Sequence, residues 1–314
     1  MEPTISSRLA GGVWGALVGD ALGVPYEFRS PDSLGPEWIR MIGGGTHDQP
    51  AGTWSDDGAL TLALLDSLLS VGFDPADQAR RYLAWYEDGA YTPDGDGLFD
   101  VGGTTRVALE RIRAGTPAES AGGTDERANG NGSLMRTLPI ALVGRDLDDA
   151  TLIEQAHRAS AVTHAHPQSQ VACAAYVLIA ARLLHGATER DGLPAAVLAR
   201  LRAAYQASGL EGHLAALDVL LRWPTRGGHG YVIDSFWSAW DAFAGAADHQ
   251  ETVVRAIRYG TDTDTTACIA GGLAGVSFGL ESIPPEWLSA VRGQDLVEPL
   301  IEPLVAGVPE VEGT

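Results

Sequence analysis

Apolar residues recur along most of the chain at a spacing of three or four positions, which is the period of an α-helix. This period predicts helices at Thr61–Ser70, Ala79–Tyr86, Thr104–Arg113, Leu152–Ala161, Gln170–Leu184, Ala195–Ala207, Leu214–Arg222, Ile233–Phe243 and Thr252–Tyr259. Clusters of Gly, Pro and Asp separate these segments and indicate loops and helix starts. No stretch alternates apolar and polar residues convincingly, as a half-buried β-strand would. We therefore expect an all-α protein of about a dozen helices.

Two segments near the end of the chain carry further expectations. The helix expected at Ala267–Gly279 is rich in Gly and Ala, which suits close contact between helices in the middle of a bundle. Gly costs a soluble helix up to about 1 kcal/mol relative to Ala, so the packing must offset this cost. The segment Gln294–Thr314 contains Pro303, Pro309 and several Glu, and we expect a short helix there that leads into a disordered end.

The charge of the chain limits the partners that it can bind. It carries 41 acidic residues and 21 basic ones, all of them Arg, for a formal net charge of −20. Such an excess argues against nucleic acids and anionic membranes, whose affinity depends on basic side chains. The apolar stretch Val171–Ala181 is too short to span a bilayer, and the N-terminus lacks the pattern of a secretory signal. Cys173 and Cys268, the only two cysteines, lie in apolar helical runs and are expected to be buried thiols rather than a disulfide. Unpaired thiols are typical of a reducing compartment, so we expect a cytoplasmic protein.

Acidic residues cluster at two predicted helix starts. Ser55-Asp56-Asp57 precedes one helix, and Asp262-Thr263-Asp264-Thr265 precedes another. One such side chain suffices to cap a helix, and adjacent carboxylates repel each other, so capping does not explain both pairs. Hydroxyl and carboxylate oxygens are ligands of Mg²⁺ or Mn²⁺ rather than Zn²⁺. If the two helix starts meet in space, a site for two metal ions can form from Ser55, Asp56, Asp57, Asp262, Asp264 and Thr265.

Five segments together resemble the ADP-ribosylglycohydrolase family, which includes the dinitrogenase reductase-activating glycohydrolase and the vertebrate ADP-ribosyl-acceptor hydrolases. They are GALVGDALGVPYEF (15–28), GTWSDDGALTLALLDSLL (52–69), FDVGGTT (99–105), NGNGSLMR (129–136) and GTDTDTTACIAGGLAG (260–275). The second and fifth segments are the specific ones, and the resemblance extends from Gly11 to about Trp287. It implies one compact orthogonal multi-helix bundle with a central binuclear metal site. We expect this domain over residues 1–293, a C-terminal tail over 294–314, and a monomer.

The resemblance also implies roles for individual residues. The six residues at the two helix starts would bind two Mg²⁺ or Mn²⁺ ions, and Asp57 would also act in catalysis. Glu27 matches an acid at the reaction centre of the family, and Asp100 matches a loop acid of its arginine-directed bacterial branch. Asp100 is otherwise a turn residue, and Asp20 is either an acid of the centre or a buried Asp with a backbone or Arg partner. Gly58 stands where the family usually has Thr, which puts the affinity of one metal site in doubt.

The loop Asn129–Ser133 is rich in glycine and is expected to run into a helix that starts near Leu134. Free backbone N–H groups at such a helix start can hold a diphosphate. The resemblance implies that Asn131, Gly132, Ser133 and Leu134 bind the diphosphate and distal ribose of ADP-ribose. It further implies that His164 reaches a phosphate and that residues 230–233 lie beside the adenine, where either Tyr231 or Trp237 is expected to stack. Without the resemblance these residues are a plain loop, a structural His and a core aromatic.

The expected function is metal-dependent hydrolysis of the C1″ bond between ADP-ribose and a protein side chain, with arginine favoured. The two ions would hold the ribose 2″ and 3″ hydroxyls and activate a water, while Glu27 or a metal-binding Asp takes its proton. The partners would be the ADP-ribosylated protein and the ADP-ribose product. Two alternatives remain open. One is a hydrolase of serine-linked ADP-ribose or of a small ADP-ribose metabolite. The other is a non-catalytic ADP-ribose-binding or immunity protein.

Overall fold

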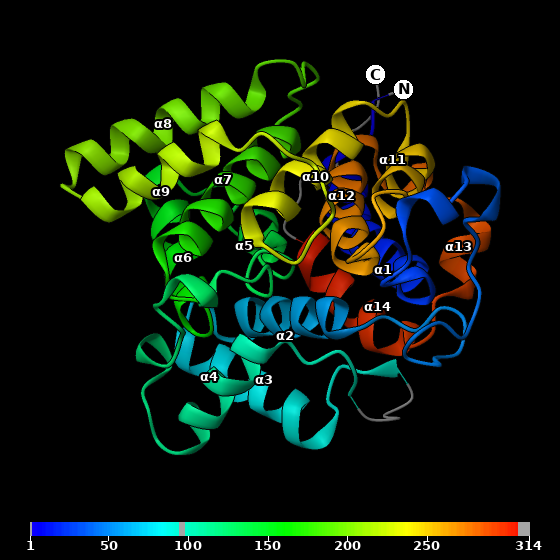
Figure 1. The fold of residues 1–314 in the computed structure, drawn as a ribbon, viewed down its shortest axis with the longest axis horizontal. Coiled ribbons are helices and arrows are strands. Elements are labelled where there is room, and N and C mark those ends of the chain that lie inside the picture. The colour runs from blue at the N-terminus through cyan, green and yellow to red at the C-terminus, as the bar shows by residue number, and fades with distance from the viewer. Residues whose placement is uncertain (1, 94–97, 307–314) are drawn as a thin grey trace.

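A computed structural model describes residues 2–93 and 98–306 of the chain, and these residues form helices joined by loops, without a β-strand. This part of the chain contains fourteen α-helices (Figure 1). They are α1 (Ile5–Gly23), α2 (Asp56–Val71), α3 (Pro75–Asp88), α4 (Gly103–Arg113), α5 (Leu138–Val143), α6 (Asp149–Ala161), α7 (Pro167–Leu184), α8 (Leu193–Ala207), α9 (Glu211–Arg222), α10 (Val232–Ala244), α11 (His249–Ile257), α12 (Thr263–Phe278), α13 (Pro285–Ala290) and α14 (Gln294–Val305). The predicted all-α fold is confirmed.

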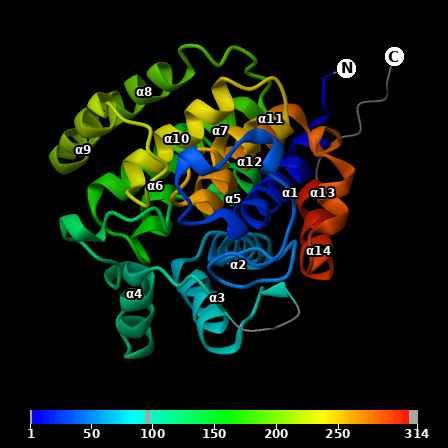
Figure 2. The ribbon, with the colours of Figure 1, turned by 45° about the vertical axis from the view of Figure 1, so that its right-hand side comes forward.

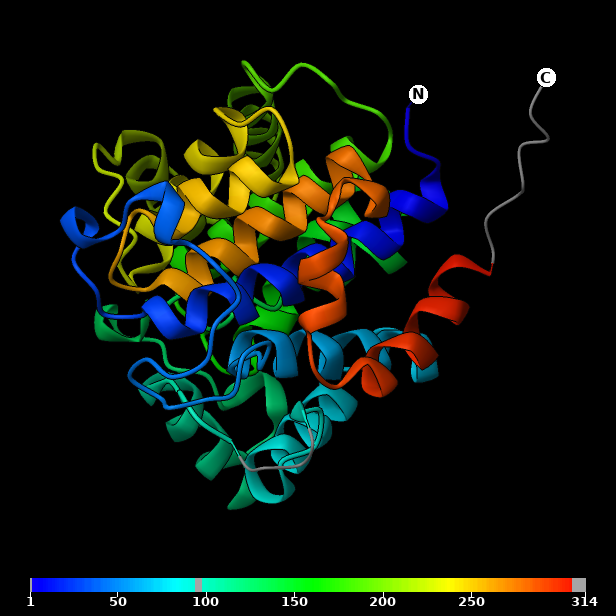
Figure 3. The same cartoon turned by 90° about the vertical axis from the view of Figure 1, so that its right-hand side faces the viewer.

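Helices α1 and α12 lie side by side and run antiparallel at the centre of the molecule (Figure 3). Glycines on one face of α1 meet the backbone of α12 so closely that a Cβ added at Gly15 or Gly19 would overlap a carbonyl group of α12. The expected close packing of the Gly-rich helix is therefore present. It brings the end of α1 against the start of α12, where Thr263 Oγ1 donates to the carbonyl of Gly23 at 2.8 Å.

The other helices surround this central pair. Helix α12 also contacts α7, α10 and α11, while α7 carries α6, α8 and α9 on its other sides. In Figure 1, α2 lies below the central pair with α3 and α4 beneath it, and Figure 2 shows α8 and α9 at the periphery. Helix α2 thus lies between the central pair and α3, and its start contacts α12.

Some elements differ from those expected. Helix α1 was not among the helices predicted from apolar spacing, because every residue from Ser7 to Gly23 is buried and the helix has no polar face. The helix expected near Leu134 starts only at Leu138, after a turn over residues 132–136, and is six residues long. Helix α11 ends at Ile257, two residues before the expected end at Tyr259.

The last helix, α14, covers the beginning of the expected tail. It packs against α1 and α2 and buries Val297 and Leu304. The disordered end expected after it falls on residues 307–314, which lie outside the described residues. Among the described helices, none combines the length and apolar character required to cross a bilayer.

Candidate active site

The starts of α2 and α12 meet in space, as the metal hypothesis requires. Ser55 caps α2, and its hydroxyl donates to Asp57 Oδ2 at 3.1 Å. Thr265 Oγ1, from the first turn of α12, donates to the same oxygen at 3.2 Å. Hydroxyl and carboxylate groups that are 208 residues apart in the chain therefore share one buried centre.

Asp20 holds the start of α2 in place from the neighbouring helix α1. Its carboxylate accepts from the backbone N–H of Ser55 at 3.0 Å and from that of Gly58 at 2.7 Å. The backbone partner expected for a buried Asp at this position is thus found. A Cβ at Gly58 would lie 2.6 Å from Cγ of Trp54, so the indole occupies the space that a Thr side chain would need. Position 58 therefore offers no hydroxyl to a metal ion, and the buried Trp54 fills the space where that side chain would lie.

The carboxylates of this centre are crowded and shielded from water. Burial, and then the neighbouring carboxylates, raises the pKa of Asp56, Asp57 and Asp264 well above the usual range. Burial raises the pKa of Asp20 to about 7, although its backbone hydrogen bonds oppose the shift. Asp57 Oδ1 and Asp264 Oδ2 are buried and have no hydrogen-bond partner among the described residues. Two or more negative charges with orphaned oxygens at one point fit bound divalent cations, which would supply the missing partners.

Glu27 and Asp100 lie beside this centre with His47 between them. His47 Nε2 is 2.5 Å from Glu27 Oε2 and 3.9 Å from Asp100 Oδ1. These three side chains are close enough together to hold a metal ion. Burial and then the charge of Asp100 raise the pKa of Glu27 to about 9. Asp100 has a left-handed backbone with φ of 53°, which costs a non-glycine residue about 1 kcal/mol or more and is typical of functional sites.

A cleft of about 270 Å³ opens over the carboxylates. Eight of the predicted site residues line it, namely Glu27, Asp56, Asp100, Asn131, Gly132, His164, Asp262 and Thr265. Ser55 and Asp57 are buried and joined to this lining by the hydrogen bonds described above, and the buried Asp264 accepts from the backbone N–H of Thr265 at 2.9 Å. Phe28 also lines the cleft and is 62% exposed, so its ring forms part of the rim.

The glycine-rich loop lines the cleft and is hydrogen-bonded to the residue that precedes α12. Asn131 Nδ2 donates to Asp262 Oδ2 at 2.8 Å, and Asn131 N donates to the carbonyl of Gly230 at 3.0 Å. Within the described chain, no protein acceptor is paired with the backbone N–H groups of Gly132 and Ser133. The loop can therefore offer two N–H donors, even though the helix expected behind it is absent.

Three predicted ligand-binding side chains point elsewhere. The Ser133 hydroxyl accepts from Ser160 at 2.9 Å, and the side chain of Leu134 is fully buried in the core. The Tyr231 hydroxyl donates to Gln168 Oε1 at 2.6 Å, and its ring lies against Trp223. None of the three lines the cleft, so Ser133 and Leu134 are available to a ligand only through their backbone.

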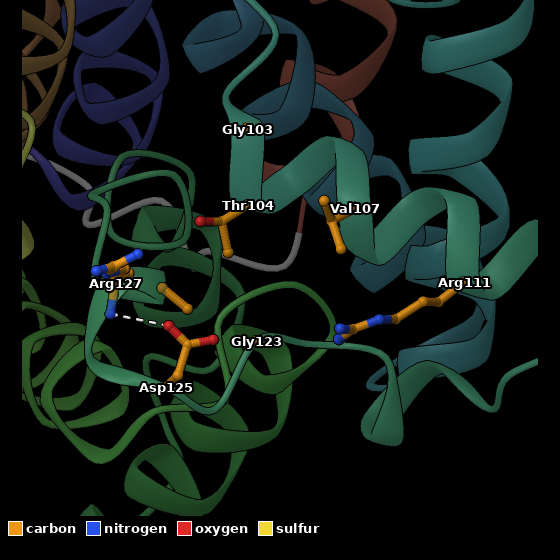
Figure 4. A pocket seen from close by; sticks show the side chains of 8 residues that line it. Gly103, Thr104, Val107, Arg111, Gly123, Asp125 and Arg127 are labelled. Carbon is orange, nitrogen blue, oxygen red and sulfur yellow. Dashed lines mark hydrogen bonds between the residues drawn. The ribbon is translucent and has the colours of Figure 1, made fainter.

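A second hollow of about 330 Å³ continues along α4 and shares Gly103 and Thr104 with the cleft (Figure 4). Val107 and Arg111 form its wall on α4, and Asp125 and Arg127 face them from the loop before the glycine-rich segment. The Arg127 backbone N–H donates to Asp125 at 2.9 Å, which caps the short turn there. The two hollows therefore adjoin at the start of α4.

A sequence profile described as ADP-ribosylglycohydrolase matches residues 1–312 of the chain, which is nearly its whole length. The chain belongs to the ADP-ribosylglycohydrolase family. It is accordingly a hydrolase of glycosyl bonds, as the resemblance implied.

Relatives and a solved structure agree with this membership. The chain is 31% identical to the ADP-ribosylarginine hydrolase Tri1 of Pseudomonas putida, over 97% of this chain and 80% of that protein. It is 29% identical to the ADP-ribosyl-[dinitrogen reductase] glycohydrolase of Rhodospirillum rubrum, over 91% of each. A solved structure described as an ADP-ribosylglycohydrolase-related protein complex matches with a TM-score of 0.78 and 34% identity, over 96% of this chain and 98% of that one.

The candidate site contains two residues that the sequence did not indicate. The Gly-rich sequence around His47 predicts an ordinary loop residue, but its side chain contacts Glu27. Arg136 belongs to the fourth family segment, where the sequence predicted no role for it, but it is buried directly behind the glycine-rich loop. Glycine near His47 indicates a loop, but it does not indicate that the His47 side chain contacts an acid 20 residues earlier. The buried position of Arg136 was equally invisible, because an Arg is usually exposed.

Proposed function

We propose that this hydrolase releases ADP-ribose from an arginine side chain by cleaving the bond at C1″ of the proximal ribose. Two relatives, from Pseudomonas putida and Serratia proteamaculans, are named ADP-ribosylarginine hydrolases. Glu27 and Asp100 lie together in the cleft wall, and acidic groups there suit a leaving group that carries a guanidinium charge. The partners are then an ADP-ribosylated protein and the ADP-ribose product.

Two Mg²⁺ or Mn²⁺ ions are the proposed cofactors. The residues that would hold them are Ser55, Asp56, Asp57, Asp262, Asp264 and Thr265. The observation that carries this proposal is the pair of buried oxygens, Asp57 Oδ1 and Asp264 Oδ2, that lack any hydrogen-bond partner in the described chain. When bound, such ions polarise sugar hydroxyls and lower the pKa of water.

The side chains around the cleft would act on the sugar and on the attacking water. Cleavage at C1″ builds positive charge on the ribose ring, and the surrounding carboxylates stabilise that charge. His47 contacts Oε2 of Glu27, so Oε1 is the oxygen that would accept the proton of the water, once bound cations offset the neighbouring charges that raise the pKa of Glu27. Asp57 fixes the hydroxyls of Ser55 and Thr265 and thereby holds the two helix starts in register.

The rest of the ligand would lie along the glycine-rich loop. We propose that Asn131, Gly132, Ser133 and Leu134 contact the diphosphate and distal ribose, the last two through backbone groups. His164 lines the same part of the cleft and would donate to a phosphate oxygen. Tyr231 would contact the adenine only if its bond to Gln168 opened.

The test is a release assay on peptides that carry arginine-linked, serine-linked or glutamate-linked ADP-ribose, and on O-acetyl-ADP-ribose, with Mg²⁺ or Mn²⁺ supplied or chelated. We expect release from arginine that requires metal. Release from serine or from the metabolite, but not from arginine, would replace the proposed substrate. Tight binding of ADP-ribose without turnover of any substrate would instead identify a non-catalytic ADP-ribose-binding protein.

A further inference from the structure

Arg136 is a buried cation without an anionic partner. Its side chain is 1% exposed and lies behind the glycine-rich loop. The guanidinium donates to the carbonyl of Gly132, to Thr163 Oγ1 at 2.7 Å and to the Tyr82 hydroxyl at 3.2 Å, and it stacks over the Tyr82 ring. All of these partners are neutral, and no carboxylate of the described chain forms an ion pair with it. Buried charges in proteins are usually paired, so this one lacks its counter-charge.

The hydrogen bonds around Thr163 fix the direction of a short relay. A guanidinium can only donate, so Thr163 Oγ1 accepts from Arg136. Thr163 is fully buried, and His164 Nδ1, at 2.7 Å, is the acceptor in the described chain toward which its hydroxyl proton can point. His164 Nδ1 therefore accepts, and the ring proton of a neutral His164 sits on Nε2. The opposite tautomer would leave the Thr163 hydroxyl proton buried and unpaired, which costs about 1–3 kcal/mol.

The Nε2 side of His164 faces the cleft. His164 belongs to the cleft lining, and its Nε2 would lie 3.5 Å from a Cβ added at Gly130. Burial, and then the charge of Arg136, lowers the pKa of His164 to about 3, so the ring is neutral at pH 7. A neutral Nε2–H group beside the N–H groups of Gly132 and Ser133 can donate to an acceptor in the cleft.

We propose that Arg136 and Thr163 are positioning residues that hold His164 as the Nε2–H tautomer, so that it donates to a phosphate oxygen whose negative charge also offsets the buried Arg136. The inference rests on the proposed function for the presence of a diphosphate ligand. The relay itself depends only on contacts within the chain. An added Cβ at position 132 would lie 3.0 Å from the His164 ring, so a larger residue would crowd this corner.

The first test reads the tautomer in the full-length protein labelled with ¹⁵N-histidine, at pH 7 and without ligand. We expect the His164 signals, assigned by their loss in His164→Gln, to report a protonated Nε2 and an unprotonated Nδ1. In Thr163→Val, which is isosteric but lacks the hydroxyl, we expect the Nδ1 signal to shift toward the protonated form, while Thr163→Ser keeps the wild-type pattern. A protonated Nδ1 in the wild-type protein would overturn the inference.

The second test measures ADP-ribose binding by calorimetry with Mg²⁺ present. We expect Thr163→Val to weaken binding about tenfold and Thr163→Ser to remain within about threefold of wild type. Arg136→Gln should weaken it further, but loss of a buried guanidinium can prevent folding, so the Thr163 pair carries the test. Equal affinity of Thr163→Val and wild type would overturn the inference. No binding of ADP-ribose to the wild-type protein would refute the proposed function, and the tautomer measurement would still decide the relay.

Discussion

At the scale of single residues, the centre depends on buried carboxylates that have too few partners. Asp57 lies at its middle because its Oδ2 joins α2 to α12 and its Oδ1 has no protein partner. Such an arrangement destabilises the chain on its own, since each buried charge loses its hydration. The same arrangement becomes favourable when a divalent cation supplies the missing contacts.

We predict that Asp57→Asn removes activity while it stabilises the metal-free protein. The amide keeps the shape and one acceptor but removes a buried negative charge, so release of ADP-ribose from arginine should fall by about 10³-fold. The melting temperature in EDTA should rise by a few degrees. Asp148→Asn is the matched control, because Asp148 caps α6 on the surface and Asn caps helices equally well. Wild-type activity in Asp57→Asn would contradict the assignment of this residue.

The contacts of Glu27 illustrate what the sequence could not supply at this scale. The sequence indicated the six proposed metal ligands, because paired carboxylates at helix starts exceed what capping needs. These residues are Ser55, Asp56, Asp57, Asp262, Asp264 and Thr265. The sequence did not indicate His47, since its contact with Glu27 joins two loops whose paths depend on the packed helices. Arg136 was also unpredictable, because only the fold reveals that its charge is buried and unpaired.

At the scale of elements, the site exists because α1 and α12 approach closely in antiparallel directions. Gly11, Gly15, Gly19 and Gly23 recur every four residues; the first three face Gly or Ala of α12, and Gly23 faces the backbone of Asp264. This contact places Glu27, four residues after the end of α1, close enough for its charge to raise the pKa of Asp264 at the start of α12. The spacing of glycines therefore controls the geometry of the acidic cluster.

We predict that Gly19→Ala lowers the free energy of unfolding by about 3 kcal/mol, because the added methyl group overlaps the carbonyl of Ala267. The matched control is Gly212→Ala in α9, where the nearest atom to an added Cβ is 3.6 Å away. There the better helix propensity of Ala should stabilise the protein by up to about 1 kcal/mol. Urea denaturation of both variants measures the difference, and equal midpoints would contradict the packing argument.

Helix prediction succeeded for helices with one apolar and one polar face, such as α3 and α11. It also succeeded for α2 and α7, which are buried nearly all round but contain long apolar runs. Helix α1 lacks a polar face, and α5 and α13 have six residues each, too few to establish a period. The helix expected at Leu134 fails for another reason, since the residues after the glycine-rich loop form a turn in which Arg136 bonds back to Gly132.

At the scale of the whole molecule, the net charge of −20 separates into a surface part and a buried part. Many acids form exposed ion pairs with Arg, such as Arg158 with Glu119, and these contribute little to stability. The buried acids at the cleft are different, because they raise one another's pKa values. Binding of an anionic ligand near them requires that this negative charge be offset.

We predict that the metal-free protein becomes less stable as the pH rises from about 5 to 9. The folded chain keeps protons on Asp20 up to a pKa of about 7 and on Glu27 up to a pKa of about 9, whereas the unfolded chain releases them near pH 4. The unfolded state therefore binds fewer protons over this range, so stability falls with pH. Melting temperatures in EDTA at several pH values measure the slope. A melting temperature that rises toward pH 9 would refute the burial of these acids.

The most direct measurement of the central claim is the number of Mn²⁺ ions that the wild-type chain binds, determined from the free-ion signal in electron paramagnetic resonance. The account predicts two ions per chain at pH 7.5 and a clear loss of binding in Asp57→Asn, with Asp148→Asn unchanged. Wild-type protein that binds no Mn²⁺ at millimolar concentration would contradict the claim that the starts of α2 and α12 form a metal centre.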